Sequence, residues 1–113
     1  MVIQGNYRLF TNMDAAGESK IIPNAQGDVC ALTISGDFTE AEVVFEGRSD
    51  ASTQFFPLGG FNTADFSRET GSYTKAGIYE IDVVGMRQVR VRIISVSGGT
   101  ITVVAQLIST SEV

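Results

Sequence analysis

The sequence of 113 residues contains no histidine and one cysteine, Cys30. The absence of histidine excludes Ser-His-Asp triads, the usual zinc and copper sites and the commonest general base near neutral pH. A single cysteine forms no internal disulfide and no Cys-based metal site, and here it lacks the histidine base that activates a nucleophilic thiol. The sequence therefore predicts no metal site and no cofactor.

Carboxylate chemistry is the one hydrolytic mechanism that this composition leaves open. Asp50, Asp65 and Glu69 lie in the irregular middle of the chain, where two paired acids would serve a glycosidase. The chain has 13 acidic residues, however, so that some pair always falls in such a region. Solvated loop carboxylates are the simpler interpretation, and we predict no catalytic residues and no enzymatic activity.

Basic residues and long apolar runs are also scarce. Eight Lys and Arg against 13 Asp and Glu give a net charge of -5, whereas nucleic-acid binding needs a concentrated basic surface. No apolar run reaches the roughly 18 residues that cross a bilayer. The N-terminus MVIQGNYRLF lacks the features of a signal peptide. We therefore expect no nucleic-acid partner, no membrane insertion and synthesis in the cytoplasm.

Strand periodicity is clearest between residues 77 and 107. Three runs there alternate apolar and polar residues, as half-buried strands do, and only tight turn signals separate them. This pattern predicts a three-stranded antiparallel meander. In such a meander Glu80 and Asp82 of the first run lie opposite or diagonal to Arg90 and Arg92 of the second, which accounts for these charges without a binding site.

Further strands are expected over 7–10, 20–23, 29–35 and 41–46, with 29–35 and 41–46 paired to each other, and over 54–58, where Pro57 interrupts the run. In 29–35 the Cys30 side chain is expected to point inward and pack as a small hydrophobe. About six to eight short strands, with glycine-rich turns and no convincing amphipathic helix, predict a single all-β domain over 1–113. The expected fold is an antiparallel β-sandwich, jelly-roll or immunoglobulin-like, with a closed small barrel as the alternative. Residues 1–28 are expected to form either an integral strand pair or a less regular arm.

Aromatic residues concentrate between residues 48 and 76, among Gly, Ser, Thr and Asn. They are Phe55, Phe56, Phe61, Phe66 and Tyr73. Two interpretations are open: the rings close the edge of a sandwich core, or some are exposed and contact sugar rings or a partner protein. These five residues are the candidate ligand or partner surface.

Several apolar residues fall on the nominally polar faces of their strands, namely Val44, Val84, Ile94, Val104 and Ile108. Either a second layer or a subunit contact should cover them, and the last four are the candidate subunit interface. The segment 100–109 carries no charged residue, which is unusual for an edge strand. It is therefore expected to be central in its sheet or paired with another chain.

Two stretches carry a resemblance to a known group of proteins. FTEAEVVFEGRSD and, after a variable loop, GIYEIDVVGMRQVRVRIISVSGGTITVVAQL resemble small β-sandwich proteins of tailed-phage or prophage virions. The matching features are the Phe45-Glu46-Gly47 turn, the strand from Gly77 to Gly85, the Val-Arg-Val-Arg run of 89–92 and the turn at Ser97-Gly98. The resemblance implies a tail, baseplate or head-decoration component that is made in the host cytoplasm and resides in the virion. The shared positions are framework residues and indicate no binding residue.

Three functions were therefore weighed. The first is a non-enzymatic virion structural or accessory protein that contributes to assembly, decoration or host attachment, with itself and other virion proteins as partners. The second is a carbohydrate-binding module that recognises host cell-surface glycans through residues 55–73. The third is a carboxylate-dependent glycan hydrolase with one acid of raised pKa. The first agrees best with the resemblance and with the apolar residues on strand faces.

Overall fold

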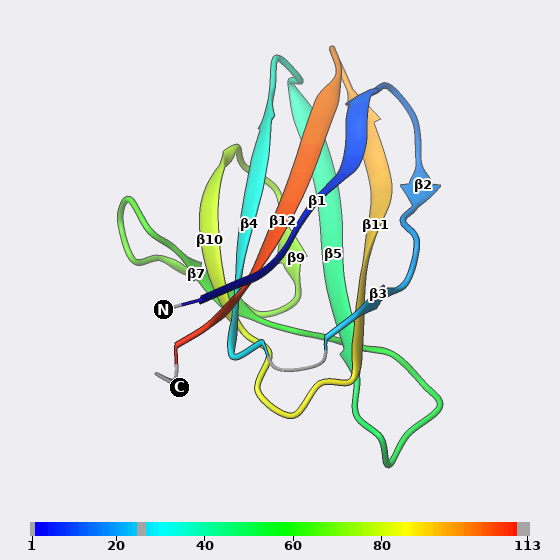
Figure 1. The fold of residues 1–113 in the computed structure, drawn as a ribbon. Helices are drawn as coiled ribbons and strands as arrows, with labels where there is room; N and C mark the ends of the chain where they lie inside the picture. Colours follow the sequence, from blue (N-terminus) through cyan, green and yellow to red (C-terminus); the bar gives the residue numbers. More distant parts are fainter. Residues whose placement is uncertain (1, 25–26, 111–113) are drawn as a thin grey trace.

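Two six-stranded β-sheets build the molecule, a computed structural model that describes residues 2–24 and 27–110 (Figure 1). In the described residues the strands are β1 (Val2–Met13), β2 (Gly17–Glu18), β3 (Ile22–Pro23), β4 (Val29–Gly36), β5 (Glu40–Arg48), β6 (Phe56–Pro57), β7 (Gly60–Asn62), β8 (Arg68–Glu69), β9 (Ser72–Tyr73), β10 (Gly77–Asp82), β11 (Gln88–Ser97) and β12 (Ile101–Ser109). Every strand pairing is antiparallel, and these described ranges contain no helix. The predicted antiparallel sandwich is confirmed.

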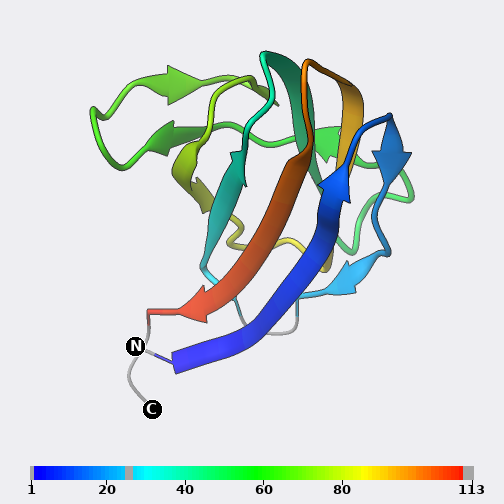
Figure 2. The ribbon, with the colours of Figure 1, turned by 90° about the horizontal axis from the view of Figure 1, so that it is seen from above.

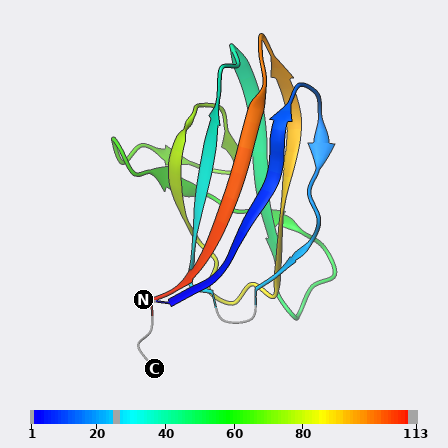
Figure 3. The same cartoon turned by 45° about the horizontal axis from the view of Figure 1, so that its top comes forward.

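We call the two layers sheet A and sheet B. Sheet A has the strand order β1-β12-β4-β10-β7-β8, and sheet B has β2-β11-β5-β6, with β3 also on β11 and β9 also on β5. In Figure 3 the blue, orange, cyan and lime strands of sheet A lie side by side in this order. From above, the green β7–β8 hairpin extends away from the body of the sandwich (Figure 2).

The predicted strands are present, and most are longer than expected. The first of them runs over Val2–Met13 instead of 7–10, because three register shifts against β12 interrupt the alternation that sequence reading depends on. The described residues form twelve strands where about six to eight were predicted, because five of the twelve have only two residues. Residues 2–24 supply β1 to sheet A and β2 and β3 to sheet B.

Two predicted pairings are wrong. β4 and β5 do not pair with each other, and β10, β11 and β12 do not form a meander, because the chain changes sheets at each of these connections. β10 pairs with β4 and β7, while β11 pairs with β5. The expected contact of Glu80 and Asp82 with Arg90 and Arg92 is therefore wrong as well, since the two pairs of residues belong to different sheets.

The core lies between the sheets and contains the inward residues of both. Cys30 and Leu32 of β4, Val43 and Phe45 of β5, and Val103 of β12 are fully buried there. Burial of about 25 cal/mol per Å² of apolar surface is the main stabilising contribution to such a core. β12 lies between β1 and β4, which agrees with the first of the two alternatives expected for the uncharged C-terminal strand, a position inside its sheet.

Candidate functional surfaces

The outer face of sheet A is uncharged over two adjacent strands, β12 and β4. Strands β12 and β4 direct alternate residues outward, and we call these eight residues the uncharged face: Thr102, Val104, Gln106, Ile108, Val29, Ala31, Thr33 and Ser35. The strand register extends it sideways with aliphatic residues. Ile3 of β1 is paired with Ile108, and Ile78 of β10 is paired with Thr33. Their side chains are 56% and 49% exposed.

Two of the four candidate interface residues, Val104 and Ile108, lie within the uncharged face. Val84 lies in the turn after β10 and lines a hollow with Val29 and Thr110, next to that face. Ile94 lies on sheet B, at the β-bulge where β11 shifts register against β5. The four residues therefore do not form one surface. Val44 also lies on sheet B and is already buried within the chain.

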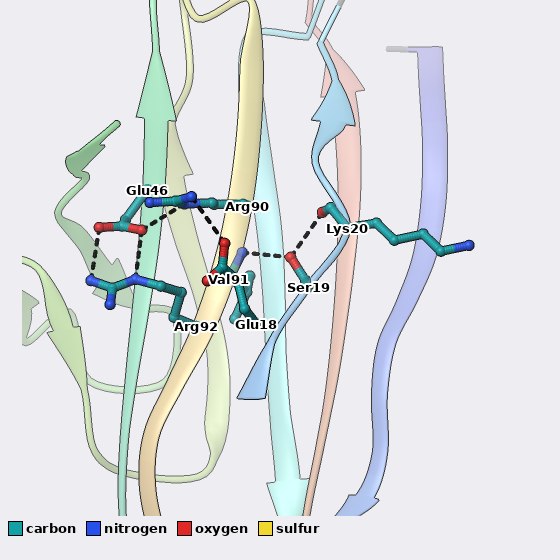
Figure 4. A network of polar contacts seen from close by, with 7 residues as sticks. All are labelled: Glu18, Ser19, Lys20, Glu46, Arg90, Val91 and Arg92. Carbon is teal, nitrogen blue, oxygen red and sulfur yellow. Dashed lines mark hydrogen bonds and ion pairs between the residues drawn. The ribbon is translucent and has the colours of Figure 1, made fainter. Parts of the chain in front are cut away.

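Sheet B carries an ion-pair network on its outer face (Figure 4). The Glu46 carboxylate of β5 accepts hydrogen bonds from Arg90 Nε at 2.9 Å and from Arg92 Nε at 2.8 Å, while Arg92 Nη2 donates to its second oxygen at 3.0 Å. Arg90 Nη1 also donates to Glu18 of β2 at 3.0 Å. Burial raises the pKa of Glu46, but the hydrogen bonds and charges of the two arginines outweigh it and hold that pKa below its ordinary value. The network joins three neighbouring strands and uses most of the basic cluster predicted from sequence.

The five candidate aromatic residues are separated by the fold. The Tyr73 ring is fully buried, packs edge-on against Tyr79 at 4.8 Å, and donates a hydrogen bond from its hydroxyl to Leu58 O. The Phe55 ring is covered by the Arg90 guanidinium, 4.2 Å from the ring centroid. Phe56 is half exposed at β6 of sheet B. Tyr73 thus closes the core, as the first interpretation expected, and Phe55 is held within the chain.

Phe61 and Phe66 remain together in the β7–β8 hairpin. Their rings stack at a centroid distance of 6.1 Å, and Phe66 is 74% exposed. Phe61 also lines a hollow of about 610 Å³ beside the hairpin, together with Arg68, Glu80 and Asp82. The sequence pattern indicates Phe61 and Phe66 but not Arg68 and Glu80, because the pairing of β7 with β8 and β10 carries no local sequence signal.

Carboxylates with shifted pKa values do not behave as general acids. The pKa values of Asp37, Glu46 and Asp65 are all lowered, and for Asp65 the largest cause is the hydrogen bond from the Ser67 backbone N–H. A glycosidase acid needs the opposite shift. Asp50 instead pairs with Arg87 at 3.1 Å on the surface.

Within residues 2–24 and 27–110 no three His, Cys, Asp or Glu side chains are grouped closely enough to hold a metal ion.

The Cys30 thiol is buried, as the sequence predicted, and burial raises its pKa to about 12. Such a thiol carries almost no thiolate near neutral pH and is inert as a nucleophile.

The part of the chain that the structure describes contains no helix of the length and apolar character that a bilayer crossing requires.

Comparison with solved structures identifies two similar proteins from prophages or phage-like elements. The SPBc2 prophage-derived protein YomS superposes with a TM-score of 0.82 over 96% of both chains at 20% sequence identity. The PBSX exported protein XepA superposes with a TM-score of 0.82 at 25% identity, over 91% of this chain and 37% of that one. YomS therefore shares the fold.

Sequence comparison also identifies a relative from a phage-like element. The phage-like element PBSX protein XepA of Bacillus subtilis (strain 168) is 29% identical over 98 residues, which are 87% of this chain and 35% of the relative. The chain thus spans about a third of the length of the curated relative that it matches. The names of these relatives describe proteins of phage-like elements and do not describe enzymes. Because the XepA family model matches residues 8–106, the chain belongs to the XepA family.

Proposed function

We propose that this protein is a non-enzymatic structural or accessory component of a phage-like particle, and that it assembles with copies of itself through the uncharged face. The observation that carries the proposal is the difference between the two outer surfaces of the sandwich. Sheet B displays a charged network in which Glu46, Arg90 and Arg92 satisfy one another. Sheet A displays two adjacent strands, β12 and β4, without an outward charge.

Exposure of the apolar side chains on this face to water is unfavourable in free energy compared with their burial in a protein contact. Ile3 and Ile78 expose about half of their surfaces on either side of Val104 and Ile108. Each such side chain gains about 1.5–3 kcal/mol when it passes fully from water into an apolar contact. Charged residues border the uncharged face on both sides: Arg8 of β1 is paired with Val104, and Glu80 and Asp82 of β10 are paired with Ala31 and Val29. An apolar centre with a polar rim is the usual composition of a protein interface.

The relatives support the biological context. One is described as a protein of a phage-like element and as exported, and a particle component likewise leaves the cell in which it is made. We place this chain, by the same reasoning, in the virion after synthesis in the host cytoplasm. Other particle proteins are then its second class of partner.

A matched pair of lysine variants tests the proposal. Ile78 lies beside the uncharged face and Ile94 lies on sheet B, and their exposed fractions are 49% and 40%. A charge at either position is therefore tolerated similarly by the isolated fold. We expect Ile78→Lys and Val104→Lys to lower the solution mass measured by sedimentation, with circular dichroism unchanged, whereas Ile94→Lys keeps the mass of the unmodified protein. Equal effects of I78K and I94K on the mass contradict the assignment of the interface to sheet A.

A further inference from the structure

We propose that the hollow beside the β7–β8 hairpin is a saccharide-binding site, for a neutral or amine-bearing sugar. This hollow, of about 610 Å³, has Phe61 and Arg68 of the hairpin on one side and Glu80 and Asp82 of β10 on the other. It lies at the margin of sheet A, three strands from β1. The inference concerns a second activity of the same chain. The hollow adjoins the uncharged face, since Val29 belongs to both, but binding of a sugar there does not require self-association.

Strand register places an aromatic ring between opposite charges. Phe61 is paired with Glu80 on β10 and with Arg68 on β8, so the three side chains leave the sheet on the same face. Directly paired residues in neighbouring antiparallel strands have Cβ atoms about 4.5–5.5 Å apart. A pyranose ring has a similar width, which allows one sugar to contact the Phe61 ring and both charged groups.

The ring is held in place by the hairpin. Phe66 stacks on Phe61, and it sits at a φ of 60°, a left-handed conformation that a bulky residue rarely adopts. Three hydrogen bonds fix this turn: Phe66 N–H to Asn62 O at 2.8 Å, Ala64 N–H to Asn62 Oδ1 at 2.8 Å and Ser67 N–H to Asp65 Oδ1 at 3.0 Å. The turn therefore holds Phe66 in this conformation, with its ring against Phe61.

Glu80 and Arg68 are available to a ligand. Both are exposed, and the side chain of neither has a hydrogen bond or ion pair with any residue in the described part of the chain. Asp82 and Asp28, by contrast, already accept hydrogen bonds from Val84 N–H and from Thr110, respectively. The Glu80 carboxylate can therefore accept hydrogen bonds from a ligand in the hollow, and the Arg68 guanidinium can donate them.

This combination matches the chemistry of a sugar. A pyranose presents an apolar C–H face to an aromatic ring, and its hydroxyl groups both donate to a carboxylate and accept from a guanidinium. Three carboxylates, those of Asp28, Glu80 and Asp82, line the hollow against one arginine. The excess of negative charge disfavours acidic sugars and favours neutral or amine-bearing ones. Of the five aromatic residues expected from sequence to form a glycan surface, the site uses Phe61, against which Phe66 stacks. Phe55 and Tyr73 are covered within the chain, and Phe56 lies on sheet B.

Titration of the ¹⁵N-labelled full chain with three trisaccharides tests the proposal. The probes are the trimers of glucosamine, N-acetylglucosamine and galacturonic acid. We expect backbone shifts confined to residues around 60–68 and 80–84 with the first two probes and none with the third. Absence of shifts with both the glucosamine and the N-acetylglucosamine trimers overturns the proposal, as do shifts of equal size with the galacturonic acid trimer.

Variants separate a specific site from nonspecific contact. Phe61→Ala should weaken binding about tenfold, equivalent to about 1.4 kcal/mol, because the variant removes the ring on which the sugar stacks. Phe56→Ala, a half-exposed phenylalanine on sheet B, is the matched control and should leave binding unchanged. Glu80→Gln keeps the shape of the side chain and should reduce the affinity for the glucosamine trimer more than that for the N-acetylglucosamine trimer. Equal weakening by F61A and F56A, or no effect of E80Q on the ratio of the two affinities, contradicts the site. The solution mass of F61A should equal that of the unmodified protein, so that failure here is distinguishable from failure of the proposed assembly.

Discussion

One oxygen of Glu46 accepts hydrogen bonds from Arg90 Nε and Arg92 Nε at 2.9 and 2.8 Å, although the two arginines are neighbours on one face of a single strand. The arrangement joins β5 to β11, and Glu18 extends it to β2. Glu46 is only 4% exposed, so its charge depends on these partners. A buried charge that loses its partner, or two arginines that lose their carboxylate, is destabilising.

Neutralising Glu46 should therefore destabilise the protein more than neutralising a surface partner. We expect Glu46→Gln to lower the free energy of unfolding by about 2 kcal/mol, because Arg92 loses its carboxylate partner and Arg90 keeps only Glu18. Asp50→Asn is the control, since the Asp50–Arg87 pair is exposed and such pairs contribute about 0–1 kcal/mol. Urea unfolding at neutral pH measures both values. Equal losses in the two variants contradict the importance of the network.

Stability should also depend on Glu46 in acid. The folded-state pKa of this group lies below its ordinary value of 4.5, so its ionised form contributes stability above pH 4.5. That contribution is lost as the pH falls through the folded-state pKa. The difference in unfolding free energy between the unmodified protein and Glu46→Gln should thus be largest near neutral pH and shrink in urea titrations toward pH 3. A difference that is constant across this range contradicts the lowered pKa.

Two glycines with similar backbone conformations should respond differently to alanine. Gly98 and Gly85 have φ values of 74° and 81°, in the left-handed region where a Cβ costs about 1–2 kcal/mol. A Cβ on Gly98 would collide with the side chain of Thr39, whereas one on Gly85 meets nothing within 4 Å. We expect Gly98→Ala to lower the unfolding free energy by about 1–3 kcal/mol more than Gly85→Ala, as overpacking does. Calorimetric melting temperatures that fall equally in both variants contradict the crowding at Thr39.

The buried thiol gives a direct measure of the integrity of the core. Cys30 is fully buried with its pKa raised to about 12, so a thiol reagent should not modify it in the native protein at pH 8. The reaction should begin only when urea unfolds the chain, at the midpoint seen by circular dichroism. Rapid modification without denaturant shows that β4 is not packed in the core.

Periodicity in the sequence predicted the strands and their inward residues, because the direction of a side chain is set by the strand that carries it. The alternation over 29–35 correctly buried Cys30. The absence of charge over 100–109 predicted a strand that is either central or paired with another chain, and β12 lies between β1 and β4. The choice of partner strand is a non-local property. The turn at Gly98 and Gly99 has the sequence of a hairpin turn, yet it carries the chain from sheet B to sheet A.

The sequence predicted the candidate surfaces less completely than the strands, because a surface also depends on which strands are neighbours. Phe61 and Phe66 stood out in the sequence as aromatic residues in an irregular segment. Their association with Glu80 and Arg68 depends on the pairing of β7 with both β10 and β8. Ile94 was grouped with Val104 because both are apolar residues on strand faces, and only the sheet assignment separates them.

Light scattering of the unmodified protein at several concentrations tests the proposed assembly most directly. The chain has a mass of 12.1 kDa. Our account predicts a defined multiple of this mass that persists on dilution and falls when Val104 is replaced by lysine. A mass of one chain at every concentration would contradict self-association through the uncharged face.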